Sequence, residues 1–161
     1  YGDAYEKYVA GLKAAGIDPL INQNTDLPVY NIAICGSRIG REYYRRFRKY
    51  PMRADYLPKI LGEPRADACQ ILIAHNPLYF EEYAAWGADV VVSGHVHGGI
   101  MRLPVLGGVL SPNLSLFPKY DGGRFELGKA VMILSRGIGT HTIPLRIFNP
   151  AELVVLDFKK V

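Results

Sequence analysis

The stretch Ser93-Gly94-His95-Val96-His97-Gly98-Gly99 follows the short apolar run Asp89–Val92. Because that run is β-branched and a glycine cluster bounds it, we expect a buried β-strand that ends in a loop. Residues i and i+2 of an extended backbone face the same way, so His95 and His97 are expected to converge. The glycines would leave room for a metal ion or a ligand close to the backbone.

A second apolar run ends in a similar way. Ile71–Ala74 is followed by His75, so three of the four histidines come just after two apolar runs. In open α/β sheets, ligands bind beyond the C-terminal ends of the strands. Neutral imidazole suits zinc, manganese and iron, so the pattern favours a metal site over three separate structural or surface histidines. A site for phosphate chemistry would also need carboxylates.

The segment between the two histidine loops predicts a strand–helix–strand unit. We expect strands at Cys69–Ala74 and Asp89–Ser93, with a helix at Leu78–Trp86 between them. Pro77 suits the first turn of that helix, and Gly87 suits its end. A unit of this length predicts a right-handed parallel pair, which places both histidine loops at the same edge of the sheet.

Two groups of motifs resemble those of a known family. Ala74–Pro77 and Ser93–Gly99 resemble the last two motifs of the calcineurin-like metallophosphoesterases. Ser135–Thr140 and Ile143–Arg146 resemble the C-terminal portion of the bacterial membrane-associated branch of that family. The resemblance covers residues 1–20 and 70–158. It implies an α/β fold, namely the C-terminal part of a four-layer αββα sandwich with a mixed parallel and antiparallel sheet.

The first three motifs of the family do not occur in this sequence. These are Asp-x-His, Gly-Asp-x-x-Asp and Gly-Asn-His-Asp/Glu, and the opening Tyr1–Tyr5 resembles what directly follows the third. The resemblance therefore implies that residues 1–161 are the C-terminal part of a metallophosphoesterase domain. The acidic ligands and the catalytic histidine would lie upstream of Tyr1, so no catalytic residue is expected in this chain and the chain alone is expected to be inactive.

The resemblance also assigns roles to individual residues. His75 and His95 would ligate one metal ion, and His97 the other, near the substrate phosphate. The intact protein would use two divalent ions (manganese, iron or zinc), whereas this chain alone would bind metal weakly or not at all. Roles in substrate binding or in support of the ligands would fall to Asn76, Gly94, Gly98 and Arg136. Each has a structural alternative, which is a turn for Asn76 and the glycines and an ion pair for Arg136.

The composition is that of an ordinary globular domain. The 161 residues are 49% hydrophobic and 21% charged, with a net charge of +4, and they suffice for a single domain with its own core. No run of about 18 apolar residues occurs, so no membrane span is predicted. The two cysteines, Cys35 and Cys69, lack metal-ligand spacing and are expected to be buried free thiols.

Residues 37–68 form the segment least like the family and are predicted to be a variable helical insert with breaks at Pro51 and Pro58. Basic and aromatic residues alternate in Arg41–Lys49. This pattern fits binding to nucleic acid or to an anionic membrane surface, or an amphipathic helix whose arginines are solvated. Of these partners, nucleic acid is the one not expected.

The remaining elements are predicted from local patterns. A helix over residues 3–15 would start at Asp3 as N-cap, and strands are expected at Leu20–Asn22 and Val29–Cys35 around a polar turn. Turns are expected at Asn24–Asp26 and Asp121–Gly123. Strands are also expected at Ile100–Leu103, Lys129–Ser135 and Glu152–Phe158. We expect these strands to form an antiparallel part of a sheet that packs against the sheet with the histidine loops.

The resulting functional hypothesis is a metal-dependent phosphoesterase that hydrolyses phosphate mono- or diesters in the intact protein. The alternative is a non-catalytic domain that binds an anionic partner through Arg41–Lys49, and a third reading is a truncated product without a function of its own. Further expectations are a homodimer through an exposed sheet edge and contact with a membrane surface. The sequence does not fix the location, for which the bacterial cytoplasm or its membrane is the expectation.

Overall fold

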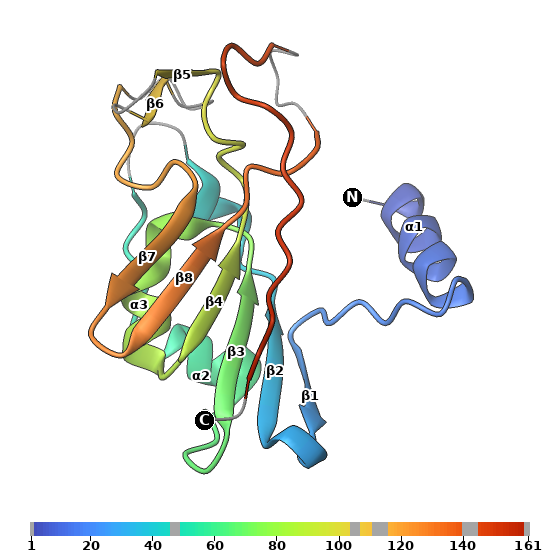
Figure 1. The fold of residues 1–161 in the computed structure, drawn as a ribbon. Helices are drawn as coiled ribbons and strands as arrows, with labels where there is room; N and C mark the ends of the chain where they lie inside the picture. Colours follow the sequence, from blue (N-terminus) through green and yellow to red (C-terminus); the bar gives the residue numbers. More distant parts are fainter. Residues whose placement is uncertain (1, 46–48, 104–106, 111–115, 140–144, 160–161) are drawn as a thin grey trace.

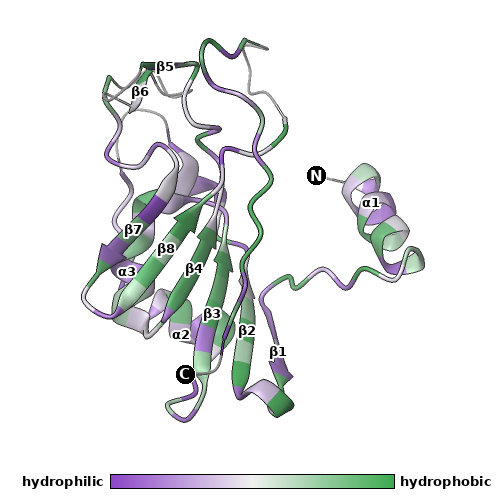
Figure 2. Cartoon of the chain, in the orientation of Figure 1, coloured by the Kyte–Doolittle hydropathy of each residue, from purple (hydrophilic) through white to green (hydrophobic). Residues whose placement is uncertain are grey.

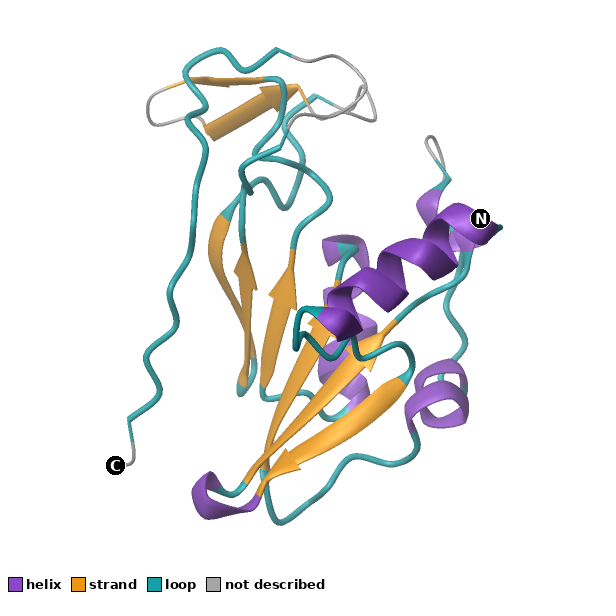
Figure 3. Ribbon diagram, turned by 90° about the vertical axis from the view of Figure 1, so that its right-hand side faces the viewer, coloured by secondary structure: helices purple, strands orange, loops and turns teal. Residues whose placement is uncertain are grey.

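The computed structural model describes residues 2–45, 49–103, 107–110, 116–139 and 145–159, and it has an α/β fold. A six-stranded sheet has the order β1-β2-β3-β4-β8-β7, with helices on one side of it (Figures 1 and 3). Its four central strands are parallel, and the strand at each edge is antiparallel to its neighbour. The strands are β1 (Gln23–Leu27), β2 (Ile32–Ser37), β3 (Cys69–Ala74), β4 (Val90–Ser93), β8 (Ala130–Leu134) and β7 (Gly123–Leu127). The predicted fold class, α/β with a mixed sheet, is confirmed, and the arrangement is consistent with a metallophosphoesterase-type sandwich.

The predicted strand–helix–strand unit is present. Strands β3 and β4 are parallel, with Ile71 opposite Val90. Between them, the short 3-10 helix η3 (Pro77–Tyr79) leads into α3 (Phe80–Trp86), which ends at Gly87 in the left-handed conformation. Both histidine loops therefore leave the same edge of the sheet.

The core lies between the sheet and the helices α2 (Tyr56–Leu61) and α3. Alternate residues of the central strands face it, as the period of two requires. They include the fully buried Leu72, Val91, Met132 and Leu134. Each such side chain contributes about 1.5–3 kcal/mol by its removal from water.

Both cysteines are free thiols, as predicted. Cys35 is buried in β2, and burial raises the pKa of its thiol to about 11. It is therefore protonated at neutral pH, which does not suit a metal ligand. Cys69, at the start of β3, is only partly buried.

The opposite face of the sheet is apolar but only partly covered. Ile73 of β3 is 46% exposed, although its neighbour Leu72 is completely buried. Hydrophobic residues dominate the central strands (Figure 2), and the extended C-terminal segment runs across this second face (Figures 1 and 3). The predicted strand at Glu152–Phe158 is wrong, because no described residue of this segment belongs to a strand. The segment lies over the face of the sheet, where no strand edge offers hydrogen-bond partners.

The N-terminal helix α1 (Asp3–Ala14) lies apart from the sheet and has no buried side chain (Figure 1). It begins one residue earlier than expected, with Gly2 rather than Asp3 as the N-cap. None of the described helices, α1 included, is both long enough and apolar enough to cross a membrane.

The predictions for residues 20–35 were partly wrong. The polar residues Gln23–Leu27, for which a turn was predicted in part, form β1, and Leu20–Asn22 do not form a strand. Strand β1 is an exposed edge strand and needs no hydrophobic pattern, so the sequence gives no sign of it. The turn instead follows at η1 (Pro28–Tyr30), and β2 begins only at Ile32.

Residues 37–68 contain less helix than predicted. The described part holds only the 3-10 helix η2 (Arg41–Tyr44) and α2. Pro58 does not break α2, because it lies in the first turn, where the helix does not need its N–H. Tyr43 of η2 packs edge-to-face against Tyr50, Tyr56 and Tyr79, which ties the segment to the core.

The C-terminal third adds strands to the existing sheet. Strand β8 pairs with β4 in parallel, so the predicted strand Lys129–Ser135 is present but does not lie in a second packed sheet. Its partner β7 starts at Gly123, where only a turn was predicted. A separate two-stranded sheet is formed by β5 (Met101–Leu103) and β6 (Gly107–Leu110).

Candidate functional site

The two histidine loops are joined directly at the sheet edge. The amide of Gly94 donates to the carbonyl of His75 at 3.1 Å. The hydroxyl of Ser93 donates to the carbonyl of Ala74 at 2.6 Å. A Cβ atom on Gly94 would lie 3.3 Å from two atoms of the His75 ring, so glycine allows the loops to approach closely.

His75 and His95 lie next to each other. Their ring centres are 5.3 Å apart, and the rings are inclined by 70°. Two imidazoles that bind one zinc ion through bonds of about 2.1 Å have ring centres roughly 5–6 Å apart. Burial of the ring lowers the pKa of His75, and the charge of His97 adds to this effect, so the neutral donor form is favoured. The pair therefore has the spacing that two ligands of one divalent metal ion would need.

The backbone of the second histidine loop is left-handed rather than extended. His95 has φ of 71° and His97 has φ of 49°, and Gly98 and Gly99 also have positive φ. The premise that the two histidines converge because they are two residues apart in a strand is therefore wrong. Histidine is one of the few residue types that adopts this region with some frequency. Holding it there costs about 1–2 kcal/mol per residue, which the surrounding contacts must offset.

His97 is not part of a three-residue metal cluster in the structure. Within the described ranges, no group of three His, Cys, Asp or Glu side chains is close enough to hold a metal ion. His97 is near enough to affect the pKa of His75, and the rings of His75 and His95 have ligand-like spacing. The assignment of His97 to a different ion from the other two stays a prediction.

Asn149 holds the histidine loop in place and was missed by the sequence analysis. Its side-chain amide donates to the carbonyls of His97 and Gly99, both at 2.7 Å, and the residue is buried. A Cβ atom on Gly98 would lie 2.6 Å from the Asn149 side-chain oxygen and 2.8 Å from Arg136. The only available signal was the Asn-Pro pair at Asn149, which is typical of a turn.

Arg136 forms the ion pair that the sequence allowed as an alternative. Its Nη2 atom lies 2.6 Å from Oε1 of Glu152, and its backbone amide donates to Oε2 at 2.9 Å. These bonds lower the pKa of Glu152. Arg136 also packs against Gly98, so it supports the histidine loop, whereas a contact with phosphate stays a prediction.

Asn76 is completely buried and has a structural role. Its amide group donates to the carbonyl of Tyr43 at 2.8 Å, and its oxygen accepts from the amide of Leu78 at 3.1 Å. These bonds join the first histidine loop to η2. As a result, the ring of Tyr44 lies 5.0 Å from that of His95 and 6.4 Å from that of His75.

The described cations of Arg41–Lys49 are partly engaged within the chain. Lys49 forms an ion pair with Glu82 at 2.7 Å and lies over the ring of Tyr79. Arg45 lies over the ring of Tyr50. Residues 46–48 lie outside the described residues, as do His141 and the Ile143–Pro144 pair of the C-terminal motif.

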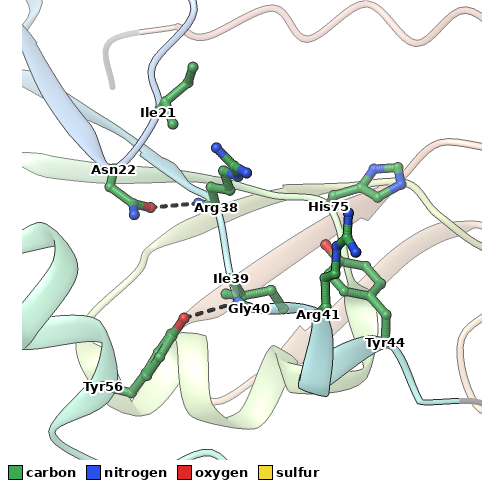
Figure 4. A pocket seen from close by; sticks show the side chains of 9 residues that line it. All are labelled: Ile21, Asn22, Arg38, Ile39, Gly40, Arg41, Tyr44, Tyr56 and His75. Carbon is green, nitrogen blue, oxygen red and sulfur yellow. Dashed lines mark hydrogen bonds between the residues drawn. The ribbon is translucent and has the colours of Figure 1, made fainter. Parts of the chain in front are cut away.

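A pocket of about 860 Å³ opens beside His75, beyond the ends of β2 and β3 (Figure 4). In this view the guanidinium group of Arg41 points toward His75. The sequence analysis did not predict this pocket, because its walls come from four separate parts of the chain. The lining residues are Ile21, Asn22, Arg38, Ile39, Gly40, Arg41, Tyr44, Tyr56 and His75.

Comparisons with known proteins agree with the motifs. The chain is 31% identical over 144 residues to the uncharacterized metallophosphoesterase Cj0846 of Campylobacter jejuni, covering 87% of this chain and 34% of that protein. It is 35% identical over 91 residues to an uncharacterized metallophosphoesterase of Aquifex aeolicus, covering 55% of this chain and 32% of that protein. It is 27% identical over 146 residues to phosphodiesterase YaeI of Escherichia coli, covering 91% of this chain and 49% of that protein.

The chain thus spans about a third to a half of the length of these relatives. No family model matches the chain, and no solved structure matches it. The similarity to several proteins named metallophosphoesterases supports the assignment of the chain to the calcineurin-like metallophosphoesterase family.

Proposed function

We propose that the protein to which this chain belongs hydrolyses phosphate mono- or diesters with the help of divalent metal ions. The observation that carries this proposal is the pair of imidazoles, His75 and His95, with ring centres 5.3 Å apart at the C-terminal edge of a parallel sheet. The names of the relatives, metallophosphoesterase and phosphodiesterase, support the same class of reaction.

In this proposal His75 and His95 hold one ion as neutral donors, and His97 holds a second ion near the scissile phosphate. Bound divalent ions, manganese, iron or zinc, would polarise a phosphoryl oxygen and lower the pKa of a water molecule. Gly94 lets the two loops meet, and Asn149 fixes the backbone on both sides of Gly98. The carboxylate ligands would come from the part of the protein that the resemblance places before Tyr1, so the chain alone would be inactive.

The test is manganese-dependent hydrolysis of bis(p-nitrophenyl) phosphate by this chain and by a form extended upstream of Tyr1. We expect activity only in the extended form, and a loss of at least about 100-fold in His95→Asn and His97→Asn. Asparagine is chosen because it tolerates positive φ, so it removes the imidazole with little change in backbone strain.

The matched control is His141→Asn, which changes the histidine outside both motifs and should retain activity. Absence of hydrolysis in the extended form with manganese, iron and zinc would contradict the proposal. Full activity in both histidine variants would contradict the assignment of the site.

The remaining expectations stay predictions. Strand β1 forms one edge of the sheet and is exposed along its length, so it is the edge at which we propose self-association. Contact with a membrane surface and a bacterial cytoplasmic or membrane location likewise remain predictions. Lys49 gives no support to the non-catalytic alternative, because it is already paired with Glu82.

A further inference from the structure

We propose that the pocket beside His75 binds a second phosphate group of the substrate through Arg38 and Arg41. This inference rests on the proposed phosphoesterase function and narrows the substrate class to phosphate esters that carry another phosphate. Nothing in the two histidine motifs identifies these arginines, which lie in the segment least like the family.

The position of the pocket connects it to the candidate metal site. His75 belongs to both, since its ring lines the pocket and lies beside the ring of His95. Tyr44 also lines the pocket and packs against the ring of His95. A substrate whose scissile phosphate is at the histidines therefore has the pocket as the adjoining space for the rest of the molecule.

The charge of the pocket favours an anion. Its described lining holds two guanidinium groups and one imidazole, but no carboxylate. Guanidinium groups bind phosphate through two parallel hydrogen bonds, which gives both strength and orientation. The carboxylate of Glu42 lies close to Gly40 but is not among the residues that line the pocket.

The backbone that carries the two arginines is fixed on both sides. The amide of Arg38 donates to the side-chain oxygen of Asn22 at 2.8 Å. The amide of Gly40 donates to the hydroxyl of Tyr56 at 3.1 Å (Figure 4). The guanidinium group of Arg38 lies 4.8 Å from the ring centre of Tyr5 in α1, which limits where it can go. Arg38 thus lies in a positioned loop directly after β2, and Arg41 lies at the start of η2.

The pocket is larger than one phosphate group alone would need. A volume of about 860 Å³ lies within the usual range for small-molecule sites, which is about 300–1,000 Å³. Apolar and aromatic side chains, including Ile39 and Tyr56, share the walls with the arginines. The geometry therefore suits an organic group between the scissile phosphate and the second phosphate.

The test measures the binding of inorganic pyrophosphate by calorimetry, at low ionic strength and with a chelator present so that metal binding does not contribute. We expect saturable binding that weakens by roughly tenfold in Arg38→Gln and in Arg41→Gln, the loss of one charge-assisted contact in each. Arg124→Gln is the matched control, because Arg124 lies in β7 at the far side of the sheet and pairs with Glu126.

Circular dichroism and thermal unfolding of each variant show whether it is folded. Absence of pyrophosphate binding, or equal binding by the wild type and by the Arg38→Gln/Arg41→Gln double variant, would overturn the proposal. A weakened Arg124→Gln would do the same, since it would indicate general attraction to a basic protein.

A kinetic measurement separates this inference from the proposed function. In the active form of the protein, the double variant should raise KM for a p-nitrophenyl diester that carries a terminal phosphate, and leave KM for bis(p-nitrophenyl) phosphate unchanged. Equal changes for both substrates would overturn the role of the pocket but not the phosphoesterase reaction. If no ester is hydrolysed and the arginines still bind pyrophosphate, the function fails while the anion site stands.

Discussion

At the scale of single residues, Asn149 shows how a side chain far away in the sequence can fix a functional loop. It lies 52 residues after His97, yet one amide group satisfies the carbonyls of both His97 and Gly99. Backbone carbonyls in a left-handed turn have no regular ladder to pair with, so their partner must come from a side chain or water. Asn149 supplies both bonds from a buried position.

Replacing Asn149 should therefore destabilise the protein. We expect Asn149→Ala to lower the free energy of unfolding by about 1–3 kcal/mol, because two buried carbonyls lose their donor. Urea unfolding followed by circular dichroism measures the change. Asn24→Ala serves as the comparison, since Asn24 makes a single, partly buried bond to Leu61 and should cost less. Equal losses in the two variants would show that Asn149 does not hold the loop.

At the scale of elements, the histidine loop combines positive φ with a lack of space. Gly98 has φ of 74°, and a side chain there would collide with both Asn149 and Arg136. Gly128, in the turn between β7 and β8, also has positive φ but faces open space. These two glycines allow the cost of the backbone conformation to be separated from the cost of crowding.

Gly98→Ala and Gly128→Ala should accordingly differ in stability. Both variants place alanine in the left-handed region, at a cost of about 1 kcal/mol. Gly98→Ala should lower the free energy of unfolding by about 1–3 kcal/mol more, because its methyl group would collide with Asn149, which holds the loop in place. Chemical denaturation of both proteins gives the comparison, and a Gly98→Ala protein as stable as Gly128→Ala would argue against a crowded loop.

The sequence predicted some elements correctly for physical reasons that can be stated. Strands β3 and β4 are buried on the helix side and pair in parallel, so they appear as continuous apolar runs, and Pro77 and Gly87 mark the ends of the helical segment between them. Strand β1 was missed because an exposed edge strand has no hydrophobic period. The C-terminal segment was wrongly assigned as a strand because an extended segment lying over an apolar face has the same composition as a strand.

The candidate site was predictable only in part. His75, His95 and His97 follow from apolar runs and glycines that are adjacent in sequence. The left-handed backbone of His95 and His97 does not, because local preference for that region is weak. Arg38 and Asn149 could not be identified either, since each joins the site through contacts between distant parts of the chain.

At the scale of the whole molecule, the ion pair of Arg136 and Glu152 fastens the start of the C-terminal segment to the end of the sheet. Glu152 accepts from both the side chain and the backbone of Arg136, and its pKa is lowered for that reason. A carboxylate with a lowered pKa stabilises the folded state above the pKa of the unfolded chain, and this contribution is lost as the pH falls through the lower folded value.

The stability of the protein should therefore depend on Glu152 in acid. Between about pH 5.5 and pH 3, we expect the wild type to lose about 1 kcal/mol more of its unfolding free energy than Glu152→Gln. Urea unfolding at several pH values tests this. Glu126→Gln is the control, because Glu126 belongs to an exposed pair on β7 and should behave as the wild type does. Parallel pH profiles for the wild type and Glu152→Gln would contradict the argument.

The strand–helix–strand unit also has a consequence for the order of folding. The hydrogen bond between Ser93 and Ala74 joins residues only 19 positions apart in the sequence. The bond between Asn149 and His97 joins residues 52 positions apart. Because closure of short loops costs less entropy, the two histidine loops should meet before β8 pairs with β4 and before Asn149 bonds to the second histidine loop. In pulse-labelled hydrogen exchange during refolding, the amide of Gly94 should become protected before that of Ser135, which bonds to Ser93 across β4 and β8. The reverse order would mean that the sheet assembles from β8 first, and the histidine loops would then be shaped last rather than first.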